Sequence, residues 1–466
     1  MAVKNAVAKT WSITPSADGK RWSAWPAGDK PSSIFPLSIH ASGKYLLDAQ
    51  NSPFFIAGDT PWSIAVQLTN AQITNYLNDR QSKGCNAILF NAIERGYSSQ
   101  SPVYNNVDGQ APFTTMTPDV SWTSRNDTYW QRVDFIVNEA KARGMVCLIC
   151  PAYTGYGSGS DGWLNQYGGA SDADLQNYGA FLANRYTQGN VIWMMGGDDA
   201  NDVEAAGNYG SGTTPQRTKQ WQIVLGIRSV RTTDLVSGHT ARNGTGTVSG
   251  EAYKAWTTGY TGFNLNNVYG HDDPDDMPTL MATAVTRTGF PCFMIEAGYE
   301  NNDTTDNGAW SAAQAILSGS LGGALHGHDT LWHFGSYAPN NIGAASALSS
   351  YLSNSWVSAQ NLYAMLLSFQ WWKLEPKTDN SLVTTAKGTG MSTICPALAS
   401  DGSFAMVWTP NVAITVVMSA LTPSSVRARW FNYGDGSYTA IGTYSNTGTQ
   451  VFTPSANRIL VLDAAP

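Results

Sequence analysis

The sequence predicts an α/β protein, a (β/α)8 TIM barrel followed by a small C-terminal β-sandwich domain. Short apolar runs alternate with stretches of helical periodicity over roughly 320 residues, which is the size of a barrel with elaborated loops. After Trp371 and Trp372 the pattern changes to short alternating segments. No glycine-rich nucleotide-binding turn follows the first apolar run, so a doubly wound sheet is disfavoured.

The apolar runs have the length of buried strands in a parallel sheet. They lie near residues 54–58, 86–91, 145–150, 191–195, 234–238, 264–269, 292–296 and 329–334. A capping box, Thr69-x-x-Gln72, predicts the start of the first barrel helix. The other expected helices lie at residues 130–140, 175–186, 214–230, 276–287, 308–319 and 357–370.

Both ends of the chain differ from the barrel pattern. Residues 1–36 are expected to be a loop-like N-terminal extension, and residues 37–376 the barrel, which opens with a hairpin over 37–55. Residues 377–466 are expected to form the sandwich. Within it, Gly434-Asp435-Gly436 predicts a hairpin turn, and the apolar segments lie at 404–408, 414–418, 426–430 and 459–462.

Composition limits the classes of partner. Only 13% of the residues are charged, against a usual value of about 25%. Such a surface suits a neutral polysaccharide and an extracellular, cell-surface or virion-associated location. The net charge of −7 argues against a nucleic-acid partner. We find neither an apolar stretch long enough to span a membrane nor a signal peptide, and oligomeric state is not predicted.

The cysteines and histidines do not predict a metal or a cofactor. Five cysteines cannot all pair within the chain, and Cys147-x-x-Cys150 lies inside a predicted strand with no second pair of ligands. We therefore expect five free, buried thiols. Among the histidines, only His326-x-His328 has a spacing that brings a metal site into question, and we predict none.

Two carboxylates at the ends of apolar runs are the candidate catalytic pair. Asp198 follows the fourth run after Gly196-Gly197, and Glu296 ends the seventh. A charged residue at the carboxyl end of a barrel strand lies where barrel enzymes hold their catalytic groups. Two such groups suit glycoside hydrolysis, which needs an acid and a second carboxylate. Two alternatives stay open: Asp199 is the acid, or the carboxylates cap the following helices.

Polar and aromatic residues follow the other predicted strands. Carbohydrate sites combine aromatic faces with planar hydrogen-bonding groups. The residues expected to bind substrate are Asp59, Trp62, Asn91, Tyr153, Trp163, His239, Tyr269, Tyr299, His328 and Trp332.

These motifs together resemble the apiosidase-like glycoside hydrolases, whose C-terminal module is often labelled collagen-binding. The similarity covers residues 37–463. It is carried by Pro53-Phe54-Phe55-x-x-Gly58-Asp59-Thr60-x-Trp62, Tyr76-Leu77-x-x-Arg80, Asn190-Val191-Ile192-Trp193-x-x-Gly196-Gly197-Asp198, Glu296-x-x-Tyr299-Glu300, His326-Gly327-His328-x-x-Leu331-Trp332 and, in the tail, Trp430-Phe431-x-x-x-x-Gly436.

The resemblance implies a retaining glycosidase, with Asp198 as acid/base and Glu296 as nucleophile, acting on a polysaccharide such as one with apiosyl or arabinofuranosyl linkages. The segments 97–126, 156–172 and 199–213 match no particular member, and they would shape the sugar subsites. The alternative function is an inactive carbohydrate-binding or structural surface or virion protein on the same fold. The presence of both carboxylates favours the enzyme.

Overall fold

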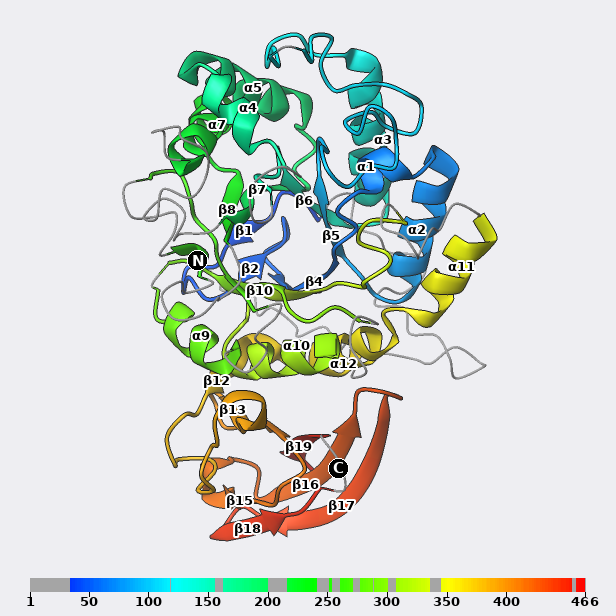
Figure 1. Cartoon of the computed structure of the whole chain (residues 1–466). Helices are drawn as coiled ribbons and strands as arrows, with labels where there is room; N and C mark the ends of the chain where they lie inside the picture. Colours follow the sequence, from blue (N-terminus) through cyan, green and yellow to red (C-terminus); the bar gives the residue numbers. More distant parts are fainter. Residues whose placement is uncertain are drawn as a thin grey trace, which may run out of the picture.

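The computed structural model describes residues 34–117, 119–155, 162–199, 216–240, 251–253, 260–270, 277–287, 289–300, 307–335, 345–454 and 458–465. Eight parallel strands form one curved sheet in the order β8-β7-β6-β5-β4-β11-β10-β9. Helices surround this sheet, and a smaller β-rich unit lies beneath it (Figure 1). The predicted barrel and sandwich are confirmed.

The barrel strands end at a common edge. They are β4 (Ile56–Asp59), β5 (Ala87–Asn91), β6 (Val146–Cys150), β7 (Val191–Asp199), β8 (Leu235–Thr240), β9 (Asn266–Tyr269), β10 (Cys292–Glu296) and β11 (Gly323–His326). The described helices are α1 (Ile64–Gln67), α2 (Asn70–Ser82), α3 (Asp127–Ala142), α4 (Leu164–Gly169), α5 (Asp172–Arg185), α7 (Gln216–Val230), α9 (Met277–Ala284), α10 (Asn307–Leu317), α11 (Ala345–Asn354) and α12 (Val357–Leu367).

Alternation along the strands divides the core into two layers. Leu148 and Ile192 pack in the cluster inside the barrel, while Ile149 and Trp193 pack in the cluster between strands and helices. Both sides are apolar, which explains why the strands read as continuous apolar runs. All five cysteines are free and buried, as expected. The capping box of Thr69 and Gln72 also forms as predicted.

The barrel closes between β8 and β9 through side chains more than through a backbone ladder. The Asn267 amide donates to Ser237 Oγ at 2.8 Å and to the Gly238 carbonyl, and the Asn264 side chain accepts from the Val236 amide. Two backbone bonds, from Asn264 and Leu265 to the Val236 carbonyl, complete this junction. We call it the asparagine seam.

The eighth strand does not lie where the sequence predicted it. Residues 329–334 form a turn, and the strand is Gly323–His326. The apolar signal is weak there because a β-carbon on Gly323 would overlap Ile56 of the neighbouring strand. The close approach requires glycine and removes an apolar side chain from the pattern. His328 and Trp332 therefore follow this strand instead of flanking it.

Three short antiparallel strands precede the barrel. They are β1 (Ser38–Ile39), β2 (Leu46–Leu47) and β3 (Pro53–Phe54), so the predicted hairpin gains a third strand. Residues 1–33 of the expected extension lie outside the described part of the chain. Within that part, no helix combines the length and apolar character needed to cross a bilayer.

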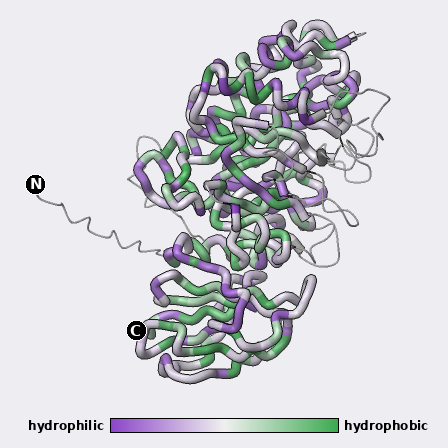
Figure 2. The backbone as a smooth tube through the Cα atoms, turned by 90° about the vertical axis from the view of Figure 1, so that its left-hand side faces the viewer, coloured by the Kyte–Doolittle hydropathy of each residue, from purple (hydrophilic) through white to green (hydrophobic). Residues whose placement is uncertain are grey.

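The C-terminal unit is a sandwich of a six-stranded and a two-stranded antiparallel sheet. Its strands are β12 (Leu374–Pro376), β13 (Cys395–Ala399), β14 (Ala405–Thr409), β15 (Ile414–Val417), β16 (Ser425–Asn432), β17 (Ser437–Ser445), β18 (Thr449–Phe452) and β19 (Arg458–Ala464). One apolar cluster joins it to the barrel, where Trp310 of α10 and Trp408 of β14 lie 5.8 Å apart. Figure 2 shows the two units as successive lobes.

Candidate active site

Glu296 lies at the carboxyl end of β10, where both of its oxygens are engaged. His239 Nε2 is 2.8 Å from Oε2, and the Tyr299 hydroxyl donates to Oε1. Trp62 Nε1 in turn donates to the Tyr299 oxygen at 3.2 Å. Glu296 is 4% exposed. A buried carboxylate is thus held in one orientation by His239 and Tyr299, and Trp62 in turn holds Tyr299.

Aromatic rings surround this carboxylate. The Trp62 ring lies 5.3 Å from His239 and 6.0 Å from Tyr153, and His239 lies 4.8 Å from Tyr269. Tyr97 extends the series, 5.8 Å from Tyr153 and 4.9 Å from Trp332. These six rings come from the ends of six strands or the loops that follow them, so most of the predicted aromatic residues meet at one rim. Tyr97 was not among the predicted residues, because it lies several residues beyond the end of β5.

A polar group lies beside the aromatic rings, at the end of β5. Asn91 Nδ2 is 3.1 Å from Glu94 Oε2, and Ser63 Oγ is 3.2 Å from the same oxygen. The Asn91 backbone amide also donates to the Trp62 carbonyl. Asn91 therefore fixes the loop that carries Trp62 and joins a second buried carboxylate to the site.

The strand that carries Asp198 changes conformation just before it. Gly196 and Gly197 have φ of 95° and 96°, and the pairing of β7 with β8 shifts between Gly196 and Asp199. A β-carbon on Gly197 would overlap the Tyr153 ring. The side chains of Asp198 and Asp199 lie outside the described part of the structure, as do Asp202, Arg242 and His271.

Asp59 forms a buried ion pair instead of a contact surface for substrate. Its Oδ2 accepts from Arg80 Nε and, at 2.5 Å, from the Tyr76 hydroxyl. Arg80 is fully buried and also contacts Asp79 and Ser355. This ion pair ties β4 to α2 and to the segment before α12.

Trp163 also lies away from Glu296. Its ring is 0% exposed and packs 5.8 Å from Trp122 and 6.3 Å from Phe113. Its backbone amide donates to the Tyr153 carbonyl at 2.8 Å. Trp163 thus supports the site through the backbone instead of presenting a ring to a ligand.

His328 and Glu300 accept hydrogen bonds that fix the backbone near the end of β11. His328 Nδ1 accepts from the Thr330 amide at 3.1 Å, and Glu300 Oε2 accepts from the Trp356 amide at 2.7 Å. Burial works against ionisation of Glu300, but the contact with His326 and the amide hydrogen bond lower its pKa to about 2. His328 thus stabilises the turn after β11, and Glu300 stabilises the segment before α12.

Comparison with protein families places the two units of the chain. A family model for an apiosidase-like catalytic domain matches residues 40–368. The chain belongs to the apiosidase-like family. A second model, for a collagen-binding-like domain of a collagenase, matches residues 378–463. Comparison with curated proteins gives no match.

Solved structures share the fold of this apiosidase-like protein. A glycoside hydrolase of family 5 from Bacteroides vulgatus has a TM-score of 0.73 at 19% identity, covering 92% of this chain and 94% of its own. A second structure, described as a glycoside hydrolase, has a TM-score of 0.73 at 18% identity, covering 93% and 99%. At such identities the likeness establishes the fold alone.

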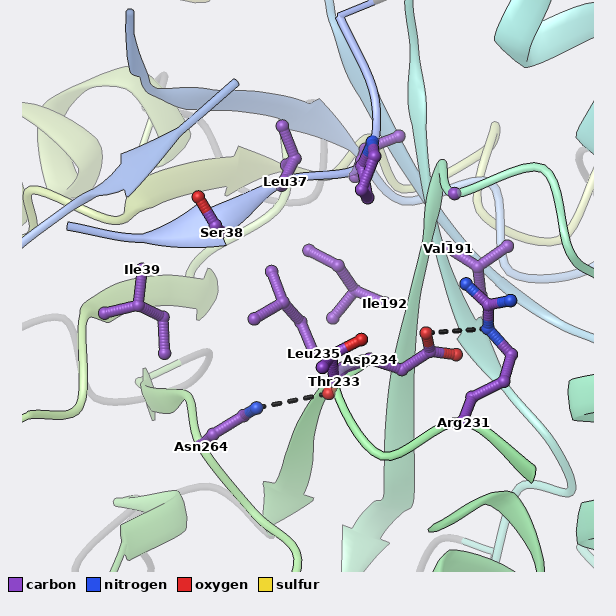
Figure 3. Close-up of a pocket in the computed structure, with 13 residues that line it drawn as sticks. Leu37, Ser38, Ile39, Val191, Ile192, Arg231, Thr233, Asp234, Leu235 and Asn264 are labelled. Atoms are coloured by element: carbon purple, nitrogen blue, oxygen red, sulfur yellow. Dashed lines mark hydrogen bonds and ion pairs between the residues drawn. The ribbon is translucent and has the colours of Figure 1, made fainter. Parts of the chain in front are cut away.

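The apiosidase-like barrel also has a cavity of about 270 Å³ at the opposite end of its strands (Figure 3). It lies between β1 and the starts of β7 and β8. There Arg231 Nε is 2.8 Å from Asp234 Oδ1, and the Asn264 amide is 3.1 Å from the Asp234 carbonyl. None of the predicted site residues is among the described residues that line it.

Proposed function

We propose that this protein is a retaining glycoside hydrolase in which Glu296 is the nucleophile and Asp198 the acid/base. The observation that carries the proposal is the setting of Glu296, a buried carboxylate at the rim whose two oxygens are held by His239 and Tyr299. A carboxylate restrained on both oxygens keeps a lone pair directed at one point, which suits attack on an anomeric carbon.

The reaction would proceed in two steps. Glu296 attacks the anomeric carbon while Asp198 protonates the departing glycosidic oxygen, which leaves a glycosyl ester on Glu296. Asp198 then removes a proton from water, and the resulting oxygen nucleophile breaks that ester and restores the free carboxylate. The Tyr299 hydroxyl and His239 hold the carboxylate through both steps.

The resemblance of Asn190–Asp198 to the acid/base strand of the family favours Asp198 over Asp199 as the acid/base. Asp198 also follows directly after Gly196 and Gly197, whose positive φ changes the direction of the backbone at the end of β7.

The substrate we propose is a neutral polysaccharide, with a pentofuranoside such as an apiosyl or arabinofuranosyl linkage as the first candidate. The rings of Trp62, Tyr153, Tyr97 and Trp332 offer stacking faces for sugar C–H surfaces. The low charged content of the chain fits a neutral ligand.

The test is a screen of 4-nitrophenyl furanosides and pyranosides together with cell-wall polysaccharides. With a responding substrate, Glu296→Gln should lose nearly all turnover, while substrate affinity is kept. Asp198→Ala should slow substrates with poor leaving groups far more than activated ones, because the latter need little protonation. NMR of the first-formed sugar should show retained anomeric configuration.

Glu375→Gln is a matched control, because this carboxylate lies in the sandwich sheet, far along the chain from the barrel rim. Wild-type turnover by Glu296→Gln would reject the mechanism. If no glycoside is cleaved but polysaccharide is bound, the inactive binding-protein function replaces the enzyme. Inversion of configuration would keep the enzyme and reject the nucleophilic role.

A further inference from the structure

The segment that presents Asp198 leaves the regular sheet before it reaches that residue. The β6–β7 ladder ends with Ile149 opposite Trp193, and the β7–β8 register shifts after Gly196. Gly196 and Gly197 both have positive φ, a conformation that a ladder does not maintain. Other contacts must therefore fix the direction of the chain at this point.

Thr154 supplies those contacts from the β6 side. Its backbone amide donates to the Gly196 carbonyl at 3.1 Å, and its hydroxyl donates to the same oxygen at 3.0 Å. The Cys150 thiol adds a weaker contact at 3.6 Å. Thr154 is 1% exposed, so these bonds are shielded from water.

Gln220 of α7 orients the Thr154 hydroxyl. Its Nε2 donates to Thr154 Oγ1 at 2.7 Å, and its side chain is also buried. Because this amide uses a lone pair of the hydroxyl oxygen, the hydroxyl hydrogen is directed to Gly196. The loop carrying Thr154 is itself fixed, since its carbonyl accepts from the Leu164 amide at 3.2 Å.

We propose that Thr154 and Gln220 are positioning residues for the acid/base: the chain α7–Gln220–Thr154–Gly196 sets the direction in which the backbone carries Asp198 over the rim. This inference rests on the proposed function. The neighbouring Tyr153 ring occupies the space that a side chain at position 197 would need, and it contacts Trp62. The turn at Gly196 and Gly197 thereby packs on Tyr153, which contacts Trp62, and Trp62 in turn bonds the Tyr299 hydroxyl that holds Glu296.

The test compares Thr154→Val, Thr154→Ser and Gln220→Met in the full-length chain. The probes are the 2,4-dinitrophenyl and phenyl glycosides of the sugar identified in the screen. Thr154→Val should lower kcat/KM on the phenyl glycoside at least about tenfold and leave kcat/KM on the dinitrophenyl glycoside within about twofold, because only the phenyl leaving group needs protonation in the first step. Gln220→Met should behave similarly but more weakly, and Thr154→Ser should restore the phenyl rate.

Thr409→Val is the matched control, because it removes an equally buried hydroxyl in the sandwich. Equal losses on both probes in Thr154→Val would show a merely structural role and overturn the inference. If Asp198→Ala shows the leaving-group dependence and Thr154→Val does not, the positioning role of Thr154 is rejected while the acid/base role of Asp198 stands. If Asp198→Ala shows none, the acid/base assignment itself fails.

A second measurement needs no substrate. Amide hydrogen exchange at residues 197–199 should be faster in Thr154→Val and Gln220→Met than in the wild type, and unchanged in Thr409→Val. Unchanged exchange in both site variants would overturn the inference even in the absence of a cleaved glycoside.

Discussion

Gly327 lies against the ring of Tyr299 so closely that a β-carbon at position 327 would overlap Cδ1 and Cε1 of that ring. Tyr299 donates to Glu296, so the missing side chain at 327 decides where this hydroxyl sits. The glycine of the His326-Gly327-His328 motif is thus required by packing.

Gly327→Ala should therefore lower kcat about 100-fold, because the displaced Tyr299 ring no longer holds Glu296. The measurement is turnover of the substrate found in the screen, with thermal unfolding to confirm that the variant is folded. Gly168→Ala is a suitable control, since nothing lies within 4 Å of the added carbon. A wild-type rate in Gly327→Ala would contradict this relationship.

Asp59→Asn should reduce stability and leave KM unchanged. The substitution breaks the buried pair with Arg80 and leaves the guanidinium undercompensated, at a cost of about 3 kcal/mol. Denaturant unfolding and KM are measured together. Asp127→Asn, which removes an exposed partner of Arg185, should cost less than about 1 kcal/mol. A raised KM with unchanged stability would instead show that Asp59 binds substrate, as the sequence predicted.

Stability should fall in acid through Glu300. Its pKa is about 2 in the folded protein against an ordinary value of 4.5, so the unfolded chain takes up a proton first. The contribution is fully present above pH 4.5 and is lost as pH falls toward 2, for a total of about 3 kcal/mol. Glu300→Gln should lower the Tm strongly at pH 7 and much less at pH 3. Thr409→Val, which removes no titratable group, should show no such dependence.

Trp408→Ala should destabilise the barrel and the sandwich together. The ring is fully buried in the cluster shared by both units, and its loss should cost about 3–5 kcal/mol. We expect one unfolding transition in calorimetry, shifted to lower temperature. Val451→Ala, at an exposed position of β18, should leave the transition in place. Two separated transitions in the wild type would show that the interface does not couple the units.

Much of the fold could be predicted because the barrel strands are buried on both sides. Val146–Cys150 is apolar throughout and Cys292–Glu296 is apolar up to its terminal carboxylate, and the structure places strands there. The eighth strand was misplaced, since close packing at Gly323 replaces an apolar side chain with glycine. Strand β17 was missed for the opposite reason, as its residues are largely exposed and give no alternation.

The sequence predicted most of the residues that meet at the site, but not the partner that each of them bonds. Glu296, His239, Tyr299 and Trp62 meet as the strand ends implied. The sequence could not show that Asp59 is neutralised by Arg80, because that pairing depends on how α2 packs. It also held no signal for Gln220, which reaches Thr154 from 66 residues away.

The asparagine seam should make the surroundings of Glu296 the first part of the barrel to open on warming. His239 stands on β8 and Glu296 on β10, so their hydrogen bond crosses the one junction described here where amide side chains substitute for most of a backbone ladder. Warming should open this line before the rest of the barrel melts. Catalytic competence would then disappear several degrees below the calorimetric midpoint and return on cooling, so the enzyme's working range would be narrower than its folded range.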